Sequence, residues 1–416
     1  MYKIENVSRP YAWGSMTAIA ELLGRPAPGG PEAELWIGAH PDSPSMAIHA
    51  DGTKQPLDKL IGSNPLHFLG AESLAAFGPR LPFLTKILAA DQPLSLQVHP
   101  SLEQAREGYA RENAAGFAAG SAERNYRDDN HKPEMIFALT DFRALCGFRP
   151  TAMAKSIFQH LATILEPTAQ GVPPIVTAVI GDLTNTDESL ALKAAFTRLI
   201  KGGRKSSDAV FEIVAVLRGG ALREPHEEAL TAMIEINDAF PGDPGVLISL
   251  LLNHLSLQPG EAVYLPAGNI HAYLHGLGVE VMASSDNVLR GGLTPKHVDV
   301  PELLRTVRFE SLGVPSVIPE GREHGQELYR PPFAEFQLQR IELSPTDEPV
   351  ALAQTGPVVV VVVSGSVVLG SATDYVSLER GAAAFIAGAE DPVHVRPRQG
   401  MVESSVAFAV TTGLGR

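Results

Sequence analysis

The sequence has little cysteine: Cys146 is the single one among 416 residues. One cysteine cannot form a disulfide within the chain, which excludes the disulfide-stapled folds of small secreted proteins and favours a reducing compartment. No apolar run reaches the roughly 18 residues of a membrane span, and the longest β-branched block, residues 358–363, has the length of a strand. The first residues lack the apolar core of a secretory signal. We therefore expect a cytoplasmic protein.

Positive charge is also scarce. The chain has 33 Lys and Arg against 47 Asp and Glu, a formal net charge of -14, and no block of consecutive basic residues. Such a chain repels nucleic acids and anionic membranes, so we expect neither as a partner. A small anionic ligand would need a few cations gathered at one site. The acidic surface is compatible with a monomer, which we expect.

The texture of the sequence changes along the chain. Residues 1–150 are rich in Pro and Gly and have short apolar runs, with one helical interruption at 101–116. Residues 151–252 have apolar residues at i, i+3, i+4 and i+7, which predicts a block of about four helices. Strand patterns return in 253–312 and in 313–416. We expect a mainly β protein in which a first β-domain (1–150 and 253–312) carries a helical insertion domain (151–252) and precedes a second β-domain (313–416).

The segment PLSLQVHP (residues 93–100) has the alternation of a half-buried strand. Leu94, Leu96 and Val98 would share one face, because alternate side chains of a strand point to the same side. The opposite face carries Ser95, Gln97 and His99. This polar row would face solvent, a metal ion or a substrate.

A second segment, PGEAVYLPAGNIHAYLHG (259–276), places Gly and Pro at the turns of a short hairpin and His271 at the start of the next strand. Its spacing resembles the second motif of the cupin superfamily, in which the histidine binds a metal within a jelly-roll barrel. The C-terminal segment has Pro392 at the position that corresponds to His271. We therefore expect a first cupin barrel with a metal and a second, cupin-like domain without a metal site.

These segments together predict a metal site formed by Gln97, His99 and His271, with Glu134 as the carboxylate. Alone, each residue has a simpler explanation, such as a solvated strand residue or the cap of a turn. Together they form a mixed nitrogen and oxygen site suited to zinc and tolerable for manganese, cobalt or iron. Because the amide adds no charge, the site keeps a net charge of about +1 with a divalent ion, which favours an oxygen-rich anionic substrate.

Longer segments carry a more specific resemblance. YRDDNHKPE (126–134) and HAYLHGLGVEVMASSDNVLRGGLTPK (271–296) resemble the two signature segments of type I mannose-6-phosphate isomerases. Further segments are similar to that family in the same order: YAWGS (11–15), LWIGAHPDSPS (35–45) and LPFLTKILAADQPLSLQVHPS (81–101). One departure is Gly291, where the family usually has Ala after the arginine. We expect it to add local flexibility without loss of chemistry.

The resemblance implies a zinc-dependent aldose–ketose isomerase that interconverts mannose 6-phosphate and fructose 6-phosphate through a cis-enediol. It also implies a cupin barrel with a helical insertion and a second cupin-like domain. The family's zinc ligands match Gln97, His99, Glu134 and His271. The residues that we expect in catalysis are Arg290, Lys132, Glu280, Asp286 and His131. Those that we expect at the substrate are Lys86, Ser95, Lys296 and Trp13.

Some roles stay open at this point. The base that moves the proton between C2 and C1 could be Glu280 or Lys132, and Lys132 would first need a lowered pKa. Ring opening could fall to His99, His131 or Asp286. Two other functions compete: an iron-dependent dioxygenase, which the missing second imidazole cluster and the nearby cations disfavour, and a non-catalytic sugar-binding cupin. The presence of Arg290, Lys132 and the whole ligand set argues against the latter.

Overall fold

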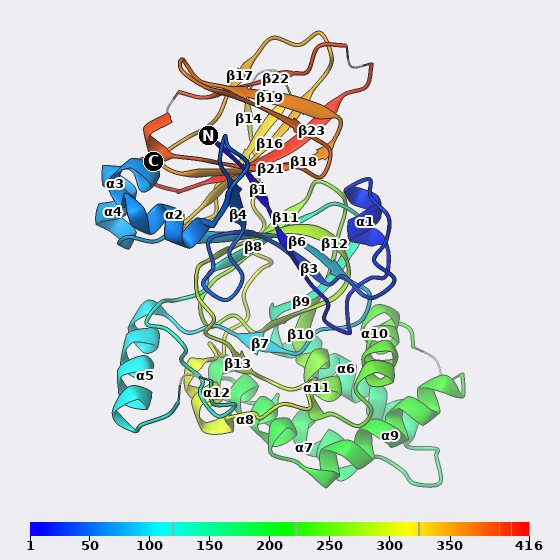
Figure 1. Cartoon of the computed structure of the whole chain (residues 1–416). Coiled ribbons are helices and arrows are strands. Elements are labelled where there is room, and N and C mark those ends of the chain that lie inside the picture. Colours follow the sequence, from blue (N-terminus) through cyan, green and yellow to red (C-terminus); the bar gives the residue numbers. More distant parts are fainter. Residues whose placement is uncertain (119, 221–222, 323–324, 391, 401, 416) are drawn as a thin grey trace.

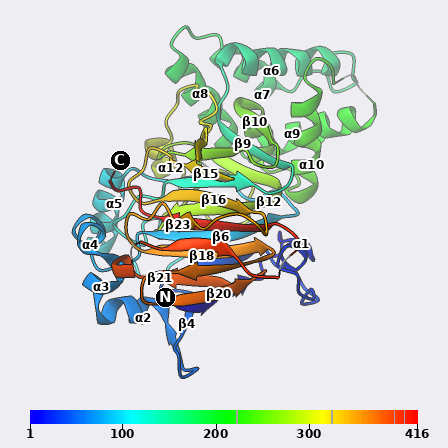
Figure 2. The same cartoon turned by 90° about the horizontal axis from the view of Figure 1, so that it is seen from above.

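The computed structural model describes residues 1–118, 120–220, 223–322, 325–390, 392–400 and 402–415. It is a mixed α and β structure with antiparallel sheets. In Figure 1 a C-terminal β region lies above a central sheet, and a group of helices lies below that sheet. Seen from above, the strands of the stacked sheets run in similar directions (Figure 2). The predicted combination of β-sheets with a helical group is confirmed at this level.

The central sheet has ten strands and follows the path β10–β9–β12–β6–β3–β2, with β8 paired to β11 and β12, and β7 paired to β12 and β13. Its strands are β2 (Val7–Arg9), β3 (Glu34–Gly38), β6 (Phe83–Ala90), β7 (Gln97–Val98), β8 (Glu134–Ala138), β9 (Phe142–Phe148), β10 (Leu252–Leu257), β11 (Ala262–Leu265), β12 (His271–Ala283) and β13 (Leu289–Arg290).

The long strand β12 joins two halves of this sheet. Its first residues pair with β7 and β9, its last residues pair with β6 and β8, and the register shifts between Tyr273 and His275. A single strand thus pairs with two sets of partners along its length. Within the described residues the main path ends at β10 and β2, so the strand pairing does not form the closed jelly-roll barrel that the sequence predicts.

The second large sheet has nine strands, in the order β14–β15–β16–β23–β18–β21–β1–β4–β5. Most come from the C-terminal segment, but β1, β4 and β5 come from the N-terminal segment that the sequence assigns to the first domain. Tyr2 in β1 faces Phe385 in β21. The bounds are β1 (Tyr2–Glu5), β4 (Met46–Ile48), β5 (Lys54–Pro56), β14 (Glu320–Arg322), β15 (Gln326–Tyr329), β16 (Gln337–Leu343), β18 (Val358–Ser364), β21 (Ala383–Ile386) and β23 (Ser405–Thr411).

The valine run of β18 shows why the layers stack. Val359 and Val361 pack with Val279 and Val281 of β12 in the core between the two large sheets. Val358, Val360 and Val362 face the opposite core, which a four-stranded sheet covers. That sheet consists of β17 (Val350–Ala351), β19 (Ser366–Gly370), β20 (Tyr375–Glu379) and β22 (His394–Pro397). Because β18 is buried on both faces, its sequence is continuously apolar instead of alternating.

Between β9 and β10 lies the helical group, made of α6 (Thr151–Leu165), α7 (Pro174–Asp182), α8 (Glu188–Ile200), α9 (Arg204–Arg218), α10 (Glu227–Ala239) and α11 (Pro244–Ile248), followed by the 3-10 turn η1 (Ser249–Leu251). Phe158 and Leu199 in these helices share a core with Leu145 and Leu274 of the sheet. The count of about four helices was too low, because α7 and α11 are short and begin at prolines, where no long helical period can develop.

The expectation of one helix in the first 150 residues was also too low. Besides α5 (Leu102–Ala114), this segment forms α1 (Ala18–Leu22), α2 (Leu57–Ser63), α3 (Pro65–Leu69) and α4 (Ala71–Phe77), and α12 (Val300–Thr306) follows later. Helix α5 begins as predicted, because Ser101 and Gln104 form a capping box. The missed helices have five to seven residues, too few for an i, i+3, i+4, i+7 pattern.

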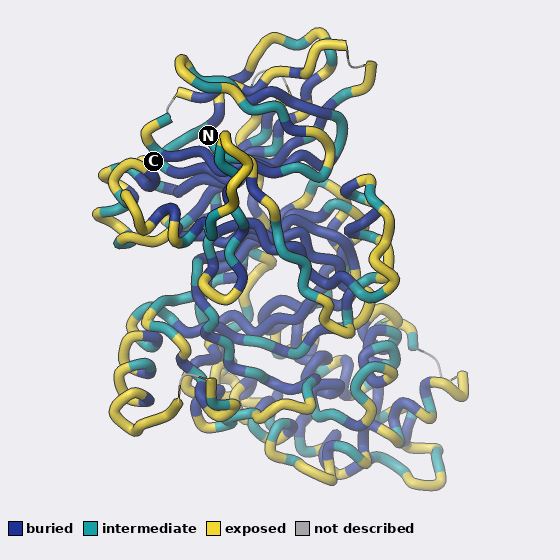
Figure 3. The backbone as a smooth tube through the Cα atoms, in the orientation of Figure 1, coloured by how far each residue is buried: buried dark blue, intermediate teal, exposed yellow. Residues whose placement is uncertain are grey.

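Buried backbone continues through all the sheets and into the inner faces of the helices (Figure 3). A second 3-10 turn, η2 (Gly388–Glu390), lies near the C-terminal strands. Among the described residues, we find no helix with the length and apolar character needed to cross a lipid bilayer.

Candidate active site

A row of polar side chains crosses the central sheet. Trp36 lies opposite Lys86, Lys86 opposite Glu280, and Glu134 opposite Met282. Because alternate residues of a strand share a face, Glu34, Trp36, Lys86, Glu280 and Glu134 lie on one side of the sheet. Ile87, Val279 and Val281 point to the other side, into the apolar core. The alternation therefore buries one face and lines a site with the other.

Lys86 is the centre of a buried ion-pair group. Its Nζ lies 2.8 Å from Glu280 Oε2 and 3.3 Å from Glu34 Oε1, and Trp36 Nε1 donates to Glu34 Oε2 at 2.7 Å. Burial by itself lowers the pKa of Lys86, but Glu280 and Glu34 raise it above its usual value, so this lysine is protonated. Burial raises the pKa of Glu280, and Lys86 opposes that rise.

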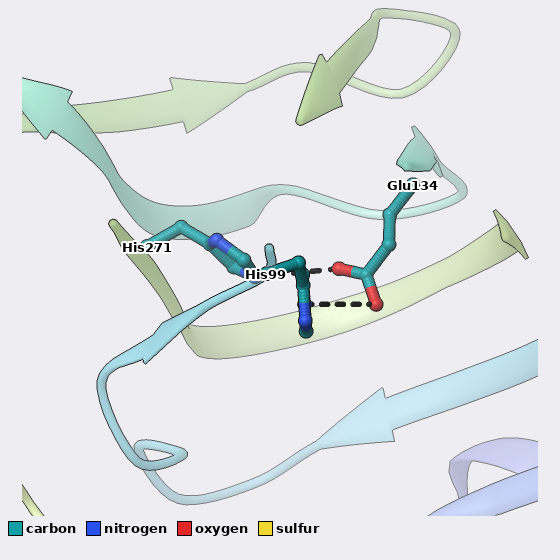
Figure 4. A group of neighbouring side chains, drawn as sticks. All are labelled: His99, Glu134 and His271. Carbon is teal, nitrogen blue, oxygen red and sulfur yellow. Dashed lines mark ion pairs between the residues drawn. The ribbon is translucent and has the colours of Figure 1, made fainter. Parts of the chain in front are cut away.

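Three of the predicted metal ligands, His99, Glu134 and His271, point toward one another, as Figure 4 shows. His99, Glu134 and His271 are each at most 3% exposed. His99 Nε2 lies 3.3 Å from Glu134 Oε1, and His271 Nε2 lies 3.3 Å from Glu134 Oε2. Their ligand atoms are close enough together to hold one metal ion.

The main chain sets the tautomer of both imidazoles. His99 Nδ1 donates to the carbonyl of Asn287 at 2.8 Å, and His271 Nδ1 donates to the carbonyl of Asn269 at 3.1 Å. A carbonyl oxygen only accepts, so in a neutral ring Nε2 keeps its lone pair. Burial, reinforced by Lys132, lowers the pKa of His99 to about 4 and keeps this ring neutral.

These lone pairs face a negative carboxylate. Burial alone raises the pKa of Glu134, but Lys132, whose Nζ lies 2.9 Å from Glu134 Oε1, lowers it well below the usual range. Within the described part of the chain, His99 Nε2 makes no hydrogen bond. Neutral nitrogen and ionised oxygen atoms that converge in a buried space suit a divalent metal ion.

The other predicted residues of the first segment lie around this centre. Gln97 is partly exposed and pairs in the sheet with both His271 and Arg290. Ser95 is also partly exposed, two residues earlier. Trp13 packs against the core beside the site and stacks with Tyr11, their ring centroids 5.8 Å apart.

Two loops form the other wall, and they are joined by hydrogen bonds. Ser285 Oγ donates to Asp128 Oδ1 at 2.8 Å, and the main-chain N–H of Asp286 donates to Asp128 Oδ2 at 2.8 Å. His131 does not turn toward the two ligand histidines; its Nε2 lies 2.6 Å from Glu335 Oε1, a residue of the C-terminal segment. The predicted ring-opening candidates His131 and Asp286 therefore lie on loops that are held by their neighbours.

A group of cations accompanies these loops. Burial lowers the pKa of Arg290, and Arg127 lowers it further. Burial also lowers the pKa of Lys296, to which Arg290 and Arg127 add their charges. Like charges that disfavour one another in this way are stabilised when an anion binds among them. Arg127 was missed in the sequence, although it lies within the segment YRDDNHKPE.

His40 is a second residue that was missed. It is buried, its Nε2 lies 3.3 Å from Asp286 Oδ2, and its Nδ1 accepts the N–H of Asp42 at 3.3 Å. Burial by itself raises the pKa of Asp286, but His40, with Lys132 and Arg127, lowers it. Asp286 therefore stays ionised at the edge of the site. In the sequence, the only indication of a role for His40 was that the segment LWIGAHPDSPS, which contains it, resembles the isomerase family.

The fold and these side chains define a class of protein, one built on stacked antiparallel sheets whose buried ligand group could hold a metal ion beside several cations. Residues 1–151 match the family described as phosphomannose isomerase type I, catalytic domain. The chain is 39% identical over 400 residues to mannose-6-phosphate isomerase from Escherichia coli (strain K12), covering 95% of this chain and 97% of the relative. It is 31% identical over 418 residues to the Homo sapiens protein of the same name, covering 93% of each.

Solved structures agree. The crystal structure of the K86A mutant of phosphomannose isomerase from Salmonella typhimurium has a TM-score of 0.86 and 35% identity, covering 99% of each chain. A mannose 6-phosphate isomerase bound with zinc and yttrium has a TM-score of 0.84 and 35% identity, covering 98% of each. The chain belongs to the mannose-6-phosphate isomerase family, and it is an isomerase.

Proposed function

We propose that this chain is a zinc-dependent aldose–ketose isomerase that interconverts mannose 6-phosphate and fructose 6-phosphate through a cis-enediol. The observation that carries the proposal is the meeting of His99, Glu134 and His271 beside the ion pair of Lys86 and Glu280. We also assign the central sheet to a cupin fold and the C-terminal sheets to a second, cupin-like domain, with the boundaries given above except that β1, β4 and β5 extend the sheet of the second domain. The hairpin around His271 and the stacked antiparallel sheets support this assignment.

The residues that would hold the metal are Gln97, His99, Glu134 and His271. Bound there, zinc would supply a Lewis acid that stabilises negative charge developing on the sugar oxygens. The chain prepares the ligands itself, since the carbonyl groups of Asn287 and Asn269 direct both Nε2 lone pairs toward Glu134. Lys132 keeps that carboxylate ionised through its contact at 2.9 Å.

Glu280 is the proposed base. Isomerisation removes a proton from C2 of the open-chain aldose and returns it to C1, so one carboxylate can serve both carbons. Glu280 is buried, and burial raises its pKa toward the range in which a base can also return the proton. Lys132, the alternative base, is already bound to Glu134. Lys86 orients the carboxylate of Glu280 and stabilises its negative charge through their ion pair.

Ring opening and phosphate binding are proposed for the opposite wall. Asp286 stays ionised beside His40 and can accept the proton of the anomeric hydroxyl. The carboxyl group so formed can return a proton to the ring oxygen as its bond to C1 breaks, and His131 is the second candidate for this role. Arg290, Lys296 and Arg127 supply the cations for a dianionic phosphate, and arginine can bind two phosphate oxygens at once. Trp13 and Ser95 would border the sugar.

The test is a coupled assay for fructose 6-phosphate formed from mannose 6-phosphate, before and after chelation and after zinc is added back. We expect activity to disappear with the chelator and to return with zinc. Unphosphorylated mannose is the control and should not react. Turnover that survives complete removal of metal would contradict the zinc dependence. A protein that binds zinc without turnover of mannose 6-phosphate would instead favour a sugar-binding cupin or a different sugar phosphate as the substrate.

A further inference from the structure

Asn287 lies on the same loop as Ser285 and Asp286, between β12 and β13, and is fully buried. Its Oδ1 accepts the main-chain N–H groups of Arg127 at 2.7 Å and Asp128 at 3.2 Å. Its Nδ2 donates to the carbonyl groups of Asp128 and Asn130, both at 2.8 Å. Its own carbonyl accepts Nδ1–H of His99 at 2.8 Å. A single residue thus connects a metal-ligand candidate with the loop that carries the cations.

We propose that Asn287 is the positioning residue that fixes the loop 126–133, which precedes β8, relative to the metal centre, and so determines the affinity for the sugar phosphate. This inference rests on the proposed function. The side chain uses the one acceptor and both donors that an amide has. It therefore sets the path of residues 127–130. Arg127 lies on this path, and its charge lowers the pKa of Arg290 and Lys296. Lys132, which follows, lies 2.9 Å from Glu134 Oε1.

The two tasks of Asn287 belong to different atoms. The main-chain carbonyl orients His99, and any residue at this position provides it. Only the side-chain amide holds the loop, because a carboxylate has no donors and an alanine has neither donors nor acceptors. Substitution of the side chain should therefore weaken substrate binding and leave zinc binding largely unchanged. If Asn287 had a merely structural role, its substitution would weaken substrate binding and zinc binding together.

The experiment compares Asn287→Asp and Asn287→Ala with the wild type. Zinc affinity is measured by calorimetric titration of the metal-free proteins, and KM and kcat for mannose 6-phosphate are measured with the zinc-loaded proteins. We expect KM to rise by roughly ten-fold or more, because at least two hydrogen bonds to the loop are lost, while the zinc dissociation constant changes by less than about three-fold. Asn287→Ala introduces no buried charge and decides the question if Asn287→Asp does not fold.

The matched control is Gln339, a buried amide in β16 of the C-terminal sheet. Its Oε1 accepts the N–H of Ala353 at 2.8 Å and its Nε2 donates to the carbonyl of Ala351 at 3.3 Å. Gln339→Glu and Gln339→Ala make the same chemical changes far along the chain from the site. Both should leave KM unchanged. An equal rise in KM in these controls would mean that general destabilisation causes the effect, and would overturn the inference.

Other outcomes are equally decisive. An unchanged KM in both Asn287 variants overturns the inference, and so does a zinc affinity that falls together with substrate affinity. If the wild type itself does not turn over mannose 6-phosphate, the proposed function fails, and amide hydrogen exchange then judges the role of Asn287. The N–H groups of Arg127 and Asp128 must exchange faster in Asn287→Ala, because they lose their acceptor.

Discussion

Each of the two imidazoles at the centre of the site donates from Nδ1 to a main-chain carbonyl, and this hydrogen bond decides which nitrogen can bind a metal. His271 is therefore expected to act only through Nε2. His271→Ala should weaken zinc binding by at least about 100-fold and abolish turnover, because only one imidazole, the buried carboxylate and the amide of Gln97 remain as ligands. The measurement is metal content after dialysis, together with the coupled assay.

His275→Ala is the control for this variant, since His275 lies on the same strand with its side chain exposed. It should retain both zinc and activity. Full activity in metal-free His271→Ala protein would show that the three residues are not a metal site.

The base can be tested at the same scale. Glu280→Gln keeps the size of the side chain but cannot accept the proton, so kcat should fall by roughly 10²- to 10⁴-fold while zinc content stays unchanged. When Glu280→Gln is incubated with mannose 6-phosphate in deuterium oxide, NMR should detect no exchange of the proton on C2 with solvent. If this variant keeps wild-type kcat and only Lys132→Met loses turnover, Lys132 is the base.

At the scale of elements, the substitution of glycine by alanine should change stability by different amounts at two positions. A Cβ on Gly291 would lie 3.0 Å from Ile270 Cδ1, the end of a flexible side chain that can move aside. A Cβ on Gly108 of α5 would lie 2.3 Å from the ring of Tyr126, which is buried and whose hydroxyl donates to Glu302. Gly291→Ala should change stability by less than about 1 kcal/mol, whereas Gly108→Ala should cost about 1–3 kcal/mol.

Urea unfolding of both variants gives the two values, and the coupled assay gives their activities. Gly291→Ala restores the residue usual in the family and should keep activity. A large destabilisation by Gly291→Ala would mean that the turn after Arg290 depends on glycine itself.

What the sequence predicts at this scale depends on the distance between partners. His99 and His271 could be found because each lies at the end of a motif with a local pattern. Glu34 and His40 could not be found by such reasoning, because their partners Lys86 and Asp286 are distant in sequence and are reached only through the fold. The same holds for Asn287, whose contact with Arg127 spans 160 positions of the chain. Helices shorter than two turns were missed for lack of a period.

At the scale of the whole molecule, the stacked layers join the ends of the chain to the site. The N-terminal strand β1 extends the C-terminal sheet through β21, a pairing that no local pattern predicts. The core between the large sheets contains residues of both, such as Phe137 and Phe408, whose ring centroids lie 5.1 Å apart. The C-terminal sheets therefore support the back of the sheet whose other face carries the ligands.

The contact of Glu335 with His131 is a direct link of this kind, and its pH dependence can be predicted. Burial by itself raises the pKa of Glu335, but His131 lowers it below the usual range. A carboxyl group with a lowered pKa in the folded state stabilises the protein fully above its unfolded pKa of about 4.3, and this contribution is lost as the pH falls through the folded pKa. Glu335→Gln should therefore cost about 1–2 kcal/mol at pH 7, and this difference from the wild type should shrink below about pH 4.5. Urea unfolding of both proteins between pH 7 and pH 3 measures it. A difference that stays constant over this range would mean that the charge of Glu335 does not hold the loop to the C-terminal segment.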